Sequence, residues 1–365
     1  MEIFTKPIRF LLFFFLLTIA LYYGREVIVP FCIAGLLSML FLPVSRKLES
    51  KGISRGFAAL ICLLIFIAFV AGIFFLLSWQ IADLSKDLSG IEQRIKEFIE
   101  QAKQFINKTF GVTEEQQKKM MEKQQQSSGG GGSQLAGAAS SIMGSIMGIL
   151  VNCILVIVYL FLLLFLRSHI RKFILKLAPA TEQANTQKII DKSSGVARKY
   201  LTGLAMMIVC LWILYGIGFS IVGVKHAIFF AVLCGLLEII PFIGNITGTA
   251  ITIIASVAQS GDSSVIIGIL IVYAIVQFLQ TYILEPLVVG AEVNINPLAT
   301  ILVIVVGETI WGIAGMVLAI PLLGIVKIIC DHVEPLKPYG YLVGEEKKKG
   351  GGLKEKIGNL FSKQK

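Results

Sequence analysis

One short stretch, residues 236–248, joins helix-breaking residues to polar ones inside a strongly apolar region; it reads LLEIIPFIGNITG. Apolar runs precede and follow it, so the surroundings resemble membrane-spanning helix. Proline has no backbone N–H and glycine weakens a helix, so Pro241, Gly244 and Gly248 predict an interruption. Lipid cannot satisfy the backbone groups freed by such a break, which must therefore be buried in protein or line a water-filled cavity.

The polar residues of this stretch are the first candidates for a binding site. Glu238 precedes the break, and Asn245 and Thr247 follow Pro241. Freed carbonyls, helix ends and these side chains could contact a solute or an ion. The alternative is a loop between two ordinary spans, with Glu238 at the water surface.

A second apolar region is interrupted in the same way. Residues 298–306 and 316–329 are apolar, and residues 307–315 between them read GETIWGIAG, including Gly307 and Glu308. Paired hydrophobic segments interrupted by glycine or proline are the best sequence indication of a transporter's substrate site. The two regions together predict a pair of broken or re-entrant helical hairpins.

Polar residues also follow one face of the apolar span between the two breaks. Tyr273, Gln277, Thr281 and Glu285 recur every four residues, and Gln280 adjoins them. Such a stripe faces the helix bundle or a watery path. Hydrogen bonding between helices is the simpler explanation, and Glu285 before Pro286 could mark the helix end at the cytoplasmic surface.

A carboxylate inside a membrane is energetically costly, so its presence there is by default a hypothesis of function. This reasoning singles out Glu238, Glu308 and Glu285. A buried carboxylate can exchange a proton near neutral pH, as a cation/proton antiporter requires. An interfacial or structural role is the alternative for each of them.

The composition indicates an all-α, polytopic membrane protein. The 365 residues are 56% hydrophobic and 15% charged, with a mean hydropathy of +0.81, whereas soluble domains carry about 25% charged residues. The net charge of +10 comes from Lys and Arg in loops and at the C-terminus, so it gives no indication of nucleic-acid binding.

Enzyme, cofactor and metal signatures are missing from the sequence. There is no phosphate-binding Gly-x-x-x-x-Gly-Lys-Ser/Thr loop and no His-Glu-x-x-His zinc motif. The six cysteines lie in or beside apolar runs without close pairing, which is typical of buried thiols. We therefore expect neither an enzyme nor a bound cofactor or metal.

The chain divides into regions of different character. We predict N-terminal transmembrane helices over 1–80, an extracytoplasmic heptad helix and flexible Gly/Ser linker over 81–141, a span over 142–166, a basic cytoplasmic loop over 167–200, a core with two interrupted hairpins over 201–330, and a basic cytoplasmic tail over 331–365. The first two apolar runs, 8–23 and 27–42, are separated by three residues and predict a tight helical hairpin. Excess Lys and Arg in the loops places both termini in the cytoplasm.

A heptad seam follows the third predicted span. Its apolar residues alternate steps of three and four between charged ones; they are Ile81, Leu84, Leu88, Ile91, Ile95, Phe98, Ala102 and Phe105. The seam predicts an extramembrane amphipathic helix that joins subunits of a homo-oligomer. Packing on its own chain or on the membrane surface are the alternatives.

The sequence resembles the autoinducer-2 exporter (PerM-type permease) family over most of the chain, most strongly in its C-terminal half. The resemblance rests on an ordered series of residues: Glu238, Ile240-Pro241-Phe242-Ile243-Gly244, Gly248, Pro286, Gly290, Pro297, Gly307, Gly312, Gly315, Ala319 and Pro321. Asn245 departs from it, because many members have proline there. The resemblance implies an oligomeric, multi-pass protein of the bacterial inner membrane that moves small solutes without ATP.

Three functions remain open at this stage. The first is secondary transport or export of a small hydrophilic solute. The second is Na⁺(Li⁺)/H⁺ antiport, which the resemblance also allows. The third is an oligomeric membrane scaffold without transport, assembled through the heptad seam.

Overall fold

The computed structural model describes residues 2–84, 133–241, 243–259, 263–289 and 295–345, and this part of the chain is all-helical apart from turns and one isolated bridge. Six of its helices are long and apolar enough to cross a membrane, which confirms the predicted class of polytopic helical membrane protein. Most of the heptad seam lies outside the described residues; only Ile81 and Leu84 fall within them, at the end of a helix.

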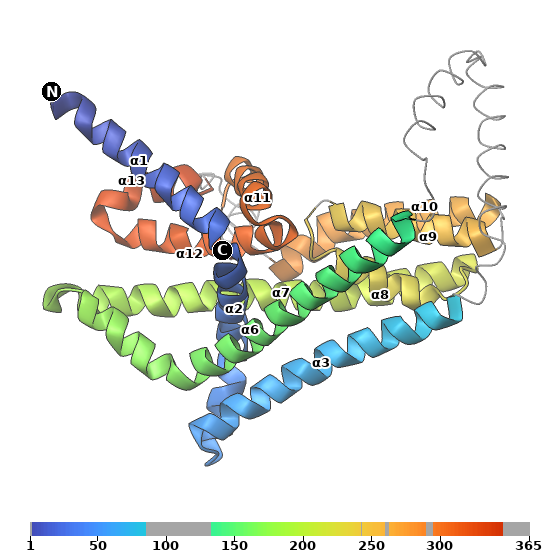
Figure 1. Ribbon diagram of the computed structural model, residues 1–365, viewed down its shortest axis with the longest axis horizontal. Coiled ribbons are helices and arrows are strands. Elements are labelled where there is room, and N and C mark those ends of the chain that lie inside the picture. Colours follow the sequence, from blue (N-terminus) through green and yellow to red (C-terminus); the bar gives the residue numbers. More distant parts are fainter. Residues whose placement is uncertain (1, 85–132, 242, 260–262, 290–294, 346–365) are drawn as a thin grey trace, which may run out of the picture.

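The N-terminal segments do not form the tight hairpin that the sequence predicts. Helix α1 (Glu2–Tyr23) passes into α2 (Arg25–Ser50) through Gly24 alone. Helical hydrogen bonds cross the junction, from the Gly24 amide to the Ala20 carbonyl (2.9 Å) and from the Ile28 amide to the Gly24 carbonyl (2.9 Å). The chain therefore bends at Gly24 instead of reversing, and α1 projects away from the rest of the molecule (Figure 1).

Helices α2, α3 (Arg55–Leu84) and α6 (Ser133–Leu177) pack together as an N-terminal unit. Ala34, Cys62 and Leu160 are fully buried where the three helices meet. Small side chains such as Ala34 allow membrane helices to approach closely, so packing between the helices can stabilise the unit without a hydrophobic driving force.

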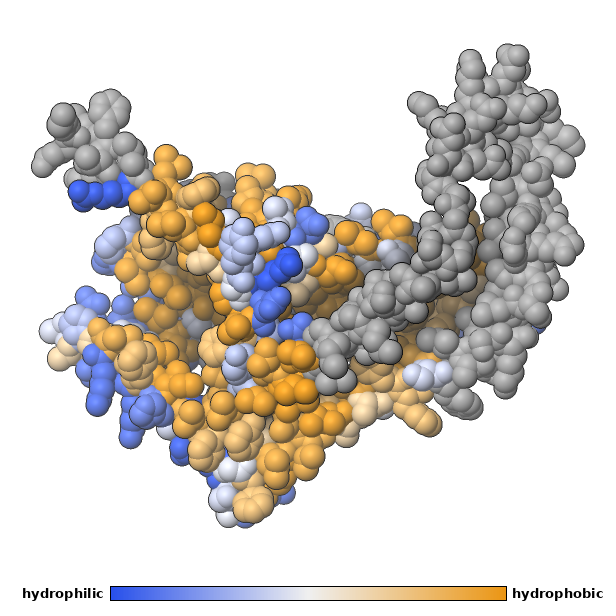
Figure 2. Space-filling view, in the orientation of Figure 1, coloured by the Kyte–Doolittle hydropathy of each residue, from blue (hydrophilic) through white to orange (hydrophobic). Residues whose placement is uncertain are grey.

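The basic stretch predicted as a cytoplasmic loop is mostly helical. Helix α6 continues to Leu177, the 3-10 turn η2 (Ala180–Glu182) follows, and α7 (Gln183–Val222) begins at once. Lys, Arg and Gln are good helix formers, so charge alone does not break a helix. Figure 2 shows hydrophilic residues gathered at the end of the molecule where α6 passes into α7, and hydrophobic surface over much of the remainder.

Helix α7 runs along the molecule, and helices of the C-terminal half pack against it (Figure 1). It packs against α8 (Ala227–Leu237) and α10 (Ser263–Leu279), while α9 (Ile243–Gln259) packs on α8 and α10. Tyr215, Phe219, Phe230 and Ile269 are buried at the centre of this unit. Gly223 (φ 83°) ends α7 in a left-handed conformation that glycine adopts readily, which lets the chain turn into α8.

Helices α11 (Pro297–Trp311) and α12 (Ile313–His332) are joined by Gly312 alone, at φ 63°. They pack on one another at two glycines, because a Cβ on Gly315 would lie 1.8 Å from the Gly307 carbonyl oxygen. The interruption is therefore narrower than the sequence predicts: Gly307 and Glu308 belong to the last turns of α11. The 3-10 turn η5 (Glu334–Leu336) and helix α13 (Lys337–Val343) complete the described chain.

Polar contacts connect the C-terminal helices to the rest of the fold. The amide group of Asn185 on α7 donates to the carbonyl oxygen of His332 at the end of α12 (3.1 Å). The side chain of Asn296 caps α11 by accepting from the Ala299 amide (2.7 Å) and donates to the Leu342 carbonyl oxygen in α13 (2.7 Å). These contacts fix the ends of α11 and α12 relative to α7 and α13.

Candidate functional site

The break between α8 and α9 is a closely packed turn over residues 238–242. The Ile240 amide donates to the Leu237 carbonyl oxygen (2.8 Å), and the Gly244 amide donates to the Ile240 carbonyl oxygen (3.1 Å). A Cβ on Gly244 would lie 1.7 Å from the Leu237 carbonyl oxygen, so only glycine fits this position without a backbone shift. The interruption that the sequence predicts is present, and it is compact.

Glu238 extends from this turn toward the end of α10. The Gln280 amide group donates to its carboxylate (2.6 Å). Gln280 is only 2% exposed, and its side-chain oxygen is buried without a hydrogen-bond partner in the described part of the chain. A buried acceptor without a partner costs about 1–3 kcal/mol.

Gln280 is also the residue at which the helix changes its winding. The chain continues from α10 as the π-helical segment η3 (Gln280–Val289), past the Glu285–Pro286 pair where the sequence predicts an end. Pro286 cannot donate a backbone hydrogen bond, and a wider π turn allows the chain to go on winding around it. Segments of this kind are frequent at functional sites because they alter which residues face inward.

A second set of hydrogen bonds links three helices behind Glu238. The Tyr215 hydroxyl on α7 donates to the Asn245 side-chain oxygen on α9 (2.8 Å), and the Asn245 amide group donates to the Gln277 side-chain oxygen on α10. The Gln277 amide group then donates to the Thr281 hydroxyl (3.3 Å). Tyr215 and Asn245 are 1% and 5% exposed, so this part of the network lies inside the helix bundle, whereas Thr281 at its other end is exposed.

These groups line one cavity of about 700 Å³, between the α8–α9 break, α7, α10, η3, α11 and α12. Its polar lining combines two carboxylates with neutral groups: Glu238, Glu285, Asn245, Gln277, Gln280, Thr281, Tyr200, Tyr273 and Thr300. We call it the polar cavity. Cavities of about 300–1,000 Å³ are typical of small-molecule sites, so one small solute fits here.

The structure brings together most of the residues that the sequence singles out. Seven of the eleven line the polar cavity: Glu238, Pro241, Asn245, Gln277, Gln280, Thr281 and Glu285. Gly244 packs behind the break, and the Thr247 hydroxyl donates to the Ile243 carbonyl oxygen on an exposed face of α9. Gly307 and Glu308 do not line this cavity; Gly307 contacts Gly315, and Glu308 is exposed.

Tyr215 is the main residue that the sequence does not reveal. It lies in a long apolar run of α7 without a repeating polar pattern, yet it holds Asn245 in place. A lone hydroxyl inside an apolar span, which needs a partner, is the signal that could have identified it. Thr300 contributes from α11 and is likewise not predicted.

The described residues contain no group of three or more His, Cys, Asp and Glu side chains that could hold a metal ion. The chemistry that the polar cavity offers is therefore hydrogen bonding from amides and hydroxyls and charge from two carboxylates. Uncharged hydroxyl and carbonyl groups, or a small cation, match that set.

Apolar helices that enclose a hydrogen-bonded polar cavity indicate a multi-pass membrane protein with a site for a small ligand or solute. Comparison with known families agrees: residues 10–334 match the AI-2E family of transporters, and the chain belongs to this family. It is a family of transporters and not of enzymes, as expected from the absence of enzyme motifs.

Several bacterial proteins are similar to this chain, two of them along most of their length and one over about a third of it. YueF of Bacillus subtilis, described as a candidate transport protein, is 28% identical over 310 residues, covering 82% of each chain. The candidate transport protein MT0215 of Mycobacterium tuberculosis is 26% identical over 298 residues, covering 81% of this chain and 80% of its own. The candidate permease PerM of Escherichia coli is 26% identical over 130 residues, or 36% of this chain.

Proposed function

We propose that this protein is a secondary, ATP-independent transporter of a small hydrophilic solute, and that the polar cavity is its solute site. The observation that carries the proposal is the polar lining of that cavity, where the Gln280 amide group donates to the Glu238 carboxylate. A solute hydroxyl or amine would donate to the same carboxylate. Sites that hydrogen-bond a solute reject analogues that lack the matching group, often by about 10⁴-fold.

The two interrupted segments suggest how such a solute would cross. The α8–α9 turn contributes Glu238 and Asn245 to the cavity, and the α11–α12 pair contributes Thr300, Ile304 and Ile320. We propose that the two pairs approach from opposite faces of the membrane as broken hairpins, with both termini in the cytoplasm of a bacterial inner membrane. Inverted arrangements of this kind place the solute near the bilayer midplane.

A cation/proton antiporter is the second candidate, favoured by the presence of two carboxylates in one cavity. Glu238 and Glu285 both line it, from the α8–α9 turn and from η3. Two neighbouring carboxylates can bind one cation or one proton in turn, which is the exchange that antiport requires.

One set of proteoliposome measurements separates the two candidates. The protein is reconstituted with an internal pH dye and pulsed with sodium, potassium or lithium, and uptake of labelled small polar metabolites is measured in parallel. Metabolite flux without a cation-dependent pH change supports solute transport. A cation-dependent pH change that disappears in Glu238→Gln makes antiport the primary function. Absence of both overturns the transport proposal.

The Glu238→Gln variant is suited to this test because a glutamine oxygen can still accept from Gln280, so the local packing is retained while the charge is removed. Glu334→Gln is the matched control: the Glu334 side chain is 82% exposed and pairs with Lys337 on the surface. We expect the control to transport normally in both assays.

Assembly through the heptad seam remains a prediction. Charged substitutions such as Leu88→Lys and Ile95→Lys are expected to lower the subunit number in detergent. An unchanged mass would contradict the proposed homo-oligomer contact.

A further inference from the structure

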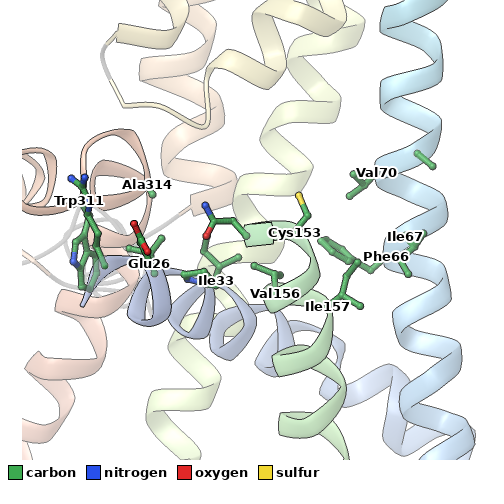
Figure 3. A pocket seen from close by; sticks show the side chains of 15 residues that line it. Glu26, Ile33, Phe66, Ile67, Val70, Cys153, Val156, Ile157, Trp311 and Ala314 are labelled. Carbon is green, nitrogen blue, oxygen red and sulfur yellow. The ribbon is translucent and has the colours of Figure 1, made fainter. Parts of the chain in front are cut away.

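A second cavity, of about 760 Å³, lies in the N-terminal half between α2, α3, α6 and the junction of α11 with α12. Figure 3 shows Glu26 and Trp311 at one end, Phe66, Ile67 and Val70 on the opposite side, and Ile33 and Val156 between them. We call it the apolar cavity. Its size is close to that of the polar cavity, but most of its lining is aliphatic or aromatic.

The charged groups of the apolar cavity are confined to one end. Arg25 and Glu26 are adjacent at the start of α2, and neither takes part in the ion pairs between described residues. The Arg25 guanidinium lies 5.3 Å from the centre of the Tyr22 ring, an arrangement that holds it in place by cation–π attraction. A positive and a negative residue thus lie next to one another in the chain at one end of the cavity.

Aromatic residues surround this charged end. Tyr22 and Tyr23 are 45% and 80% exposed, and the Trp311 indole nitrogen donates to the Leu21 carbonyl oxygen (2.9 Å). Tyrosine and tryptophan concentrate where the membrane meets water, at the level of the lipid headgroups. The aromatic cluster therefore indicates that the Arg25–Glu26 pair lies at headgroup level.

From that end, one face of α2 leads into the apolar part. Glu26, Val29, Pro30 and Ile33 follow the three- and four-residue spacing of a helix face. Seven residues of helix rise about 10 Å. The cavity thus changes along α2 from a charged end to a mainly apolar interior, whose lining also includes Asn152 and Cys153, and that order of groups matches a phospholipid.

We propose that the apolar cavity binds one phospholipid with a phosphoethanolamine headgroup. Its phosphate binds the Arg25 guanidinium, its primary ammonium binds the Glu26 carboxylate, and an acyl chain lies along Ile33 and Val156 toward Phe66. Arginine donates paired hydrogen bonds to phosphate, and a primary ammonium donates to carboxylate, so the two headgroup charges match the two side chains in sign.

Selectivity must come from the headgroup, because lipid tails are as apolar outside the cavity as inside it. A phosphocholine headgroup has the same charges, but its quaternary ammonium cannot donate a hydrogen bond to Glu26. A phosphoglycerol headgroup has the phosphate but no ammonium, so Glu26 would repel it. Comparing the affinities of lipids with these three headgroups therefore distinguishes the proposed contacts from general hydrophobic binding.

The test uses native mass spectrometry of the full-length protein in detergent, titrated with phosphatidylethanolamine, phosphatidylcholine and phosphatidylglycerol of identical acyl chains. We expect phosphatidylethanolamine to bind about tenfold more tightly than the other two, as one charge-assisted hydrogen bond provides. Equal affinity of the three lipids for the unmodified protein overturns the proposal, whatever the variants do.

Variants then assign the two headgroup contacts. Arg25→Gln should weaken binding of all three lipids, and Glu26→Gln should remove the preference for phosphatidylethanolamine over phosphatidylcholine. Lys51→Gln, an exposed basic residue at the other end of α2, is the control and should leave binding unchanged. A preference that survives Glu26→Gln overturns the assignment of the ammonium to Glu26.

A cavity-filling variant tests the acyl-chain position. Ile157→Trp places a large side chain into the apolar cavity and should weaken lipid binding about tenfold while the subunit number stays constant. If lipid binding is unaltered and the subunit number falls, a second copy of the chain occupies this face and the proposal is wrong. Thermal unfolding of each variant establishes that the protein is folded.

Discussion

The two cavities have similar volumes and opposite chemistry. The polar cavity, of about 700 Å³, lies where a helix is broken at residues 238–242 and where α10 changes to the π-helical η3. The apolar cavity, of about 760 Å³, lies mainly between unbroken helices, with its charges at one end. Irregular backbone accompanies polar lining here because lipid cannot satisfy freed backbone groups, whereas a water-filled site can.

The comparison also separates two uses of polar residues. In the polar cavity, side chains from different helices hydrogen-bond one another, as Asn245 and Gln277 do, and Tyr215 behind the cavity donates to Asn245. At the apolar cavity, Arg25 and Glu26 take part in none of the ion pairs between described residues, and we propose that they bind a lipid headgroup. Substitutions that act on one cavity and spare the other are therefore the sharpest tests of this difference.

The largest effect is expected from Gly244→Ala. The added Cβ would lie 1.7 Å from a backbone oxygen of Leu237, and backbone cannot move aside as a side chain can. We expect a loss of about 3 kcal/mol or more in unfolding free energy, the upper end of overpacking effects. Thermal unfolding in detergent measures it, and a variant as stable as the unmodified protein would show that the break is loose.

The matched control for that variant is Gly35→Ala in α2. A Cβ there meets nothing within 4 Å, and alanine favours helix over glycine. The control should be neutral or more stable by up to about 1 kcal/mol.

Gln277→Leu is expected to lower solute transport at least about tenfold, since it removes one hydrogen-bonding group from the polar cavity at similar volume. Phe278→Leu, at the next residue, is the control because Phe278 is 59% exposed and does not line the cavity. Labelled-solute uptake into proteoliposomes measures both. Equal losses in the two variants would indicate a general packing defect in α10.

Tyr215→Phe removes only the hydroxyl that donates to Asn245. The Asn245 oxygen would remain buried with one partner fewer, which should cost about 1 kcal/mol of unfolding free energy. Tyr341→Phe, at a residue that is 76% exposed, should cost nothing measurable. If the two variants unfold alike, the network behind Glu238 contributes little to stability.

The smallest effect is expected from Trp311→Phe, near the apolar cavity. It removes the hydrogen bond from the indole nitrogen to the Leu21 carbonyl oxygen. Polar contacts between membrane helices average about 0.6 kcal/mol, so a slight decrease in thermal stability is expected. A decrease in thermal stability larger than that of Tyr215→Phe would show that this contact beside the apolar cavity stabilises the protein more than the network behind Glu238 does.

Much of this arrangement could be predicted from residue type and spacing. The four-residue repeat of Gln277 and Thr281 predicts a polar helix face, and Pro241 with Gly244 predicts a break. Both follow from local backbone chemistry, which does not depend on distant residues. The bend at Gly24 was mispredicted as a hairpin. The three residues between the apolar runs, Gly24, Arg25 and Glu26, are compatible with either a turn or a continuous helix.

The pairing of side chains could not be predicted in this way. Gln280 and Glu238 are separated by 42 positions in the chain, and Tyr215 has no pattern that marks it. Glu308 satisfies the same sequence criteria as Glu238 yet is exposed on α11. The helices that surround a residue determine which side chains meet, and single-sequence periodicity contains no information about neighbours across helices.

The sequence by itself determined that this protein is a multi-pass helical membrane protein with two interrupted apolar regions, because hydropathy and helix-breaking residues act locally. Only the tertiary structure decided which carboxylates share a cavity, that the second interruption narrows to Gly312, and that a further apolar cavity forms beside Arg25 and Glu26. Those features arise where separate helices pack together, and packing depends on the shape and chemistry of surfaces far apart in the chain.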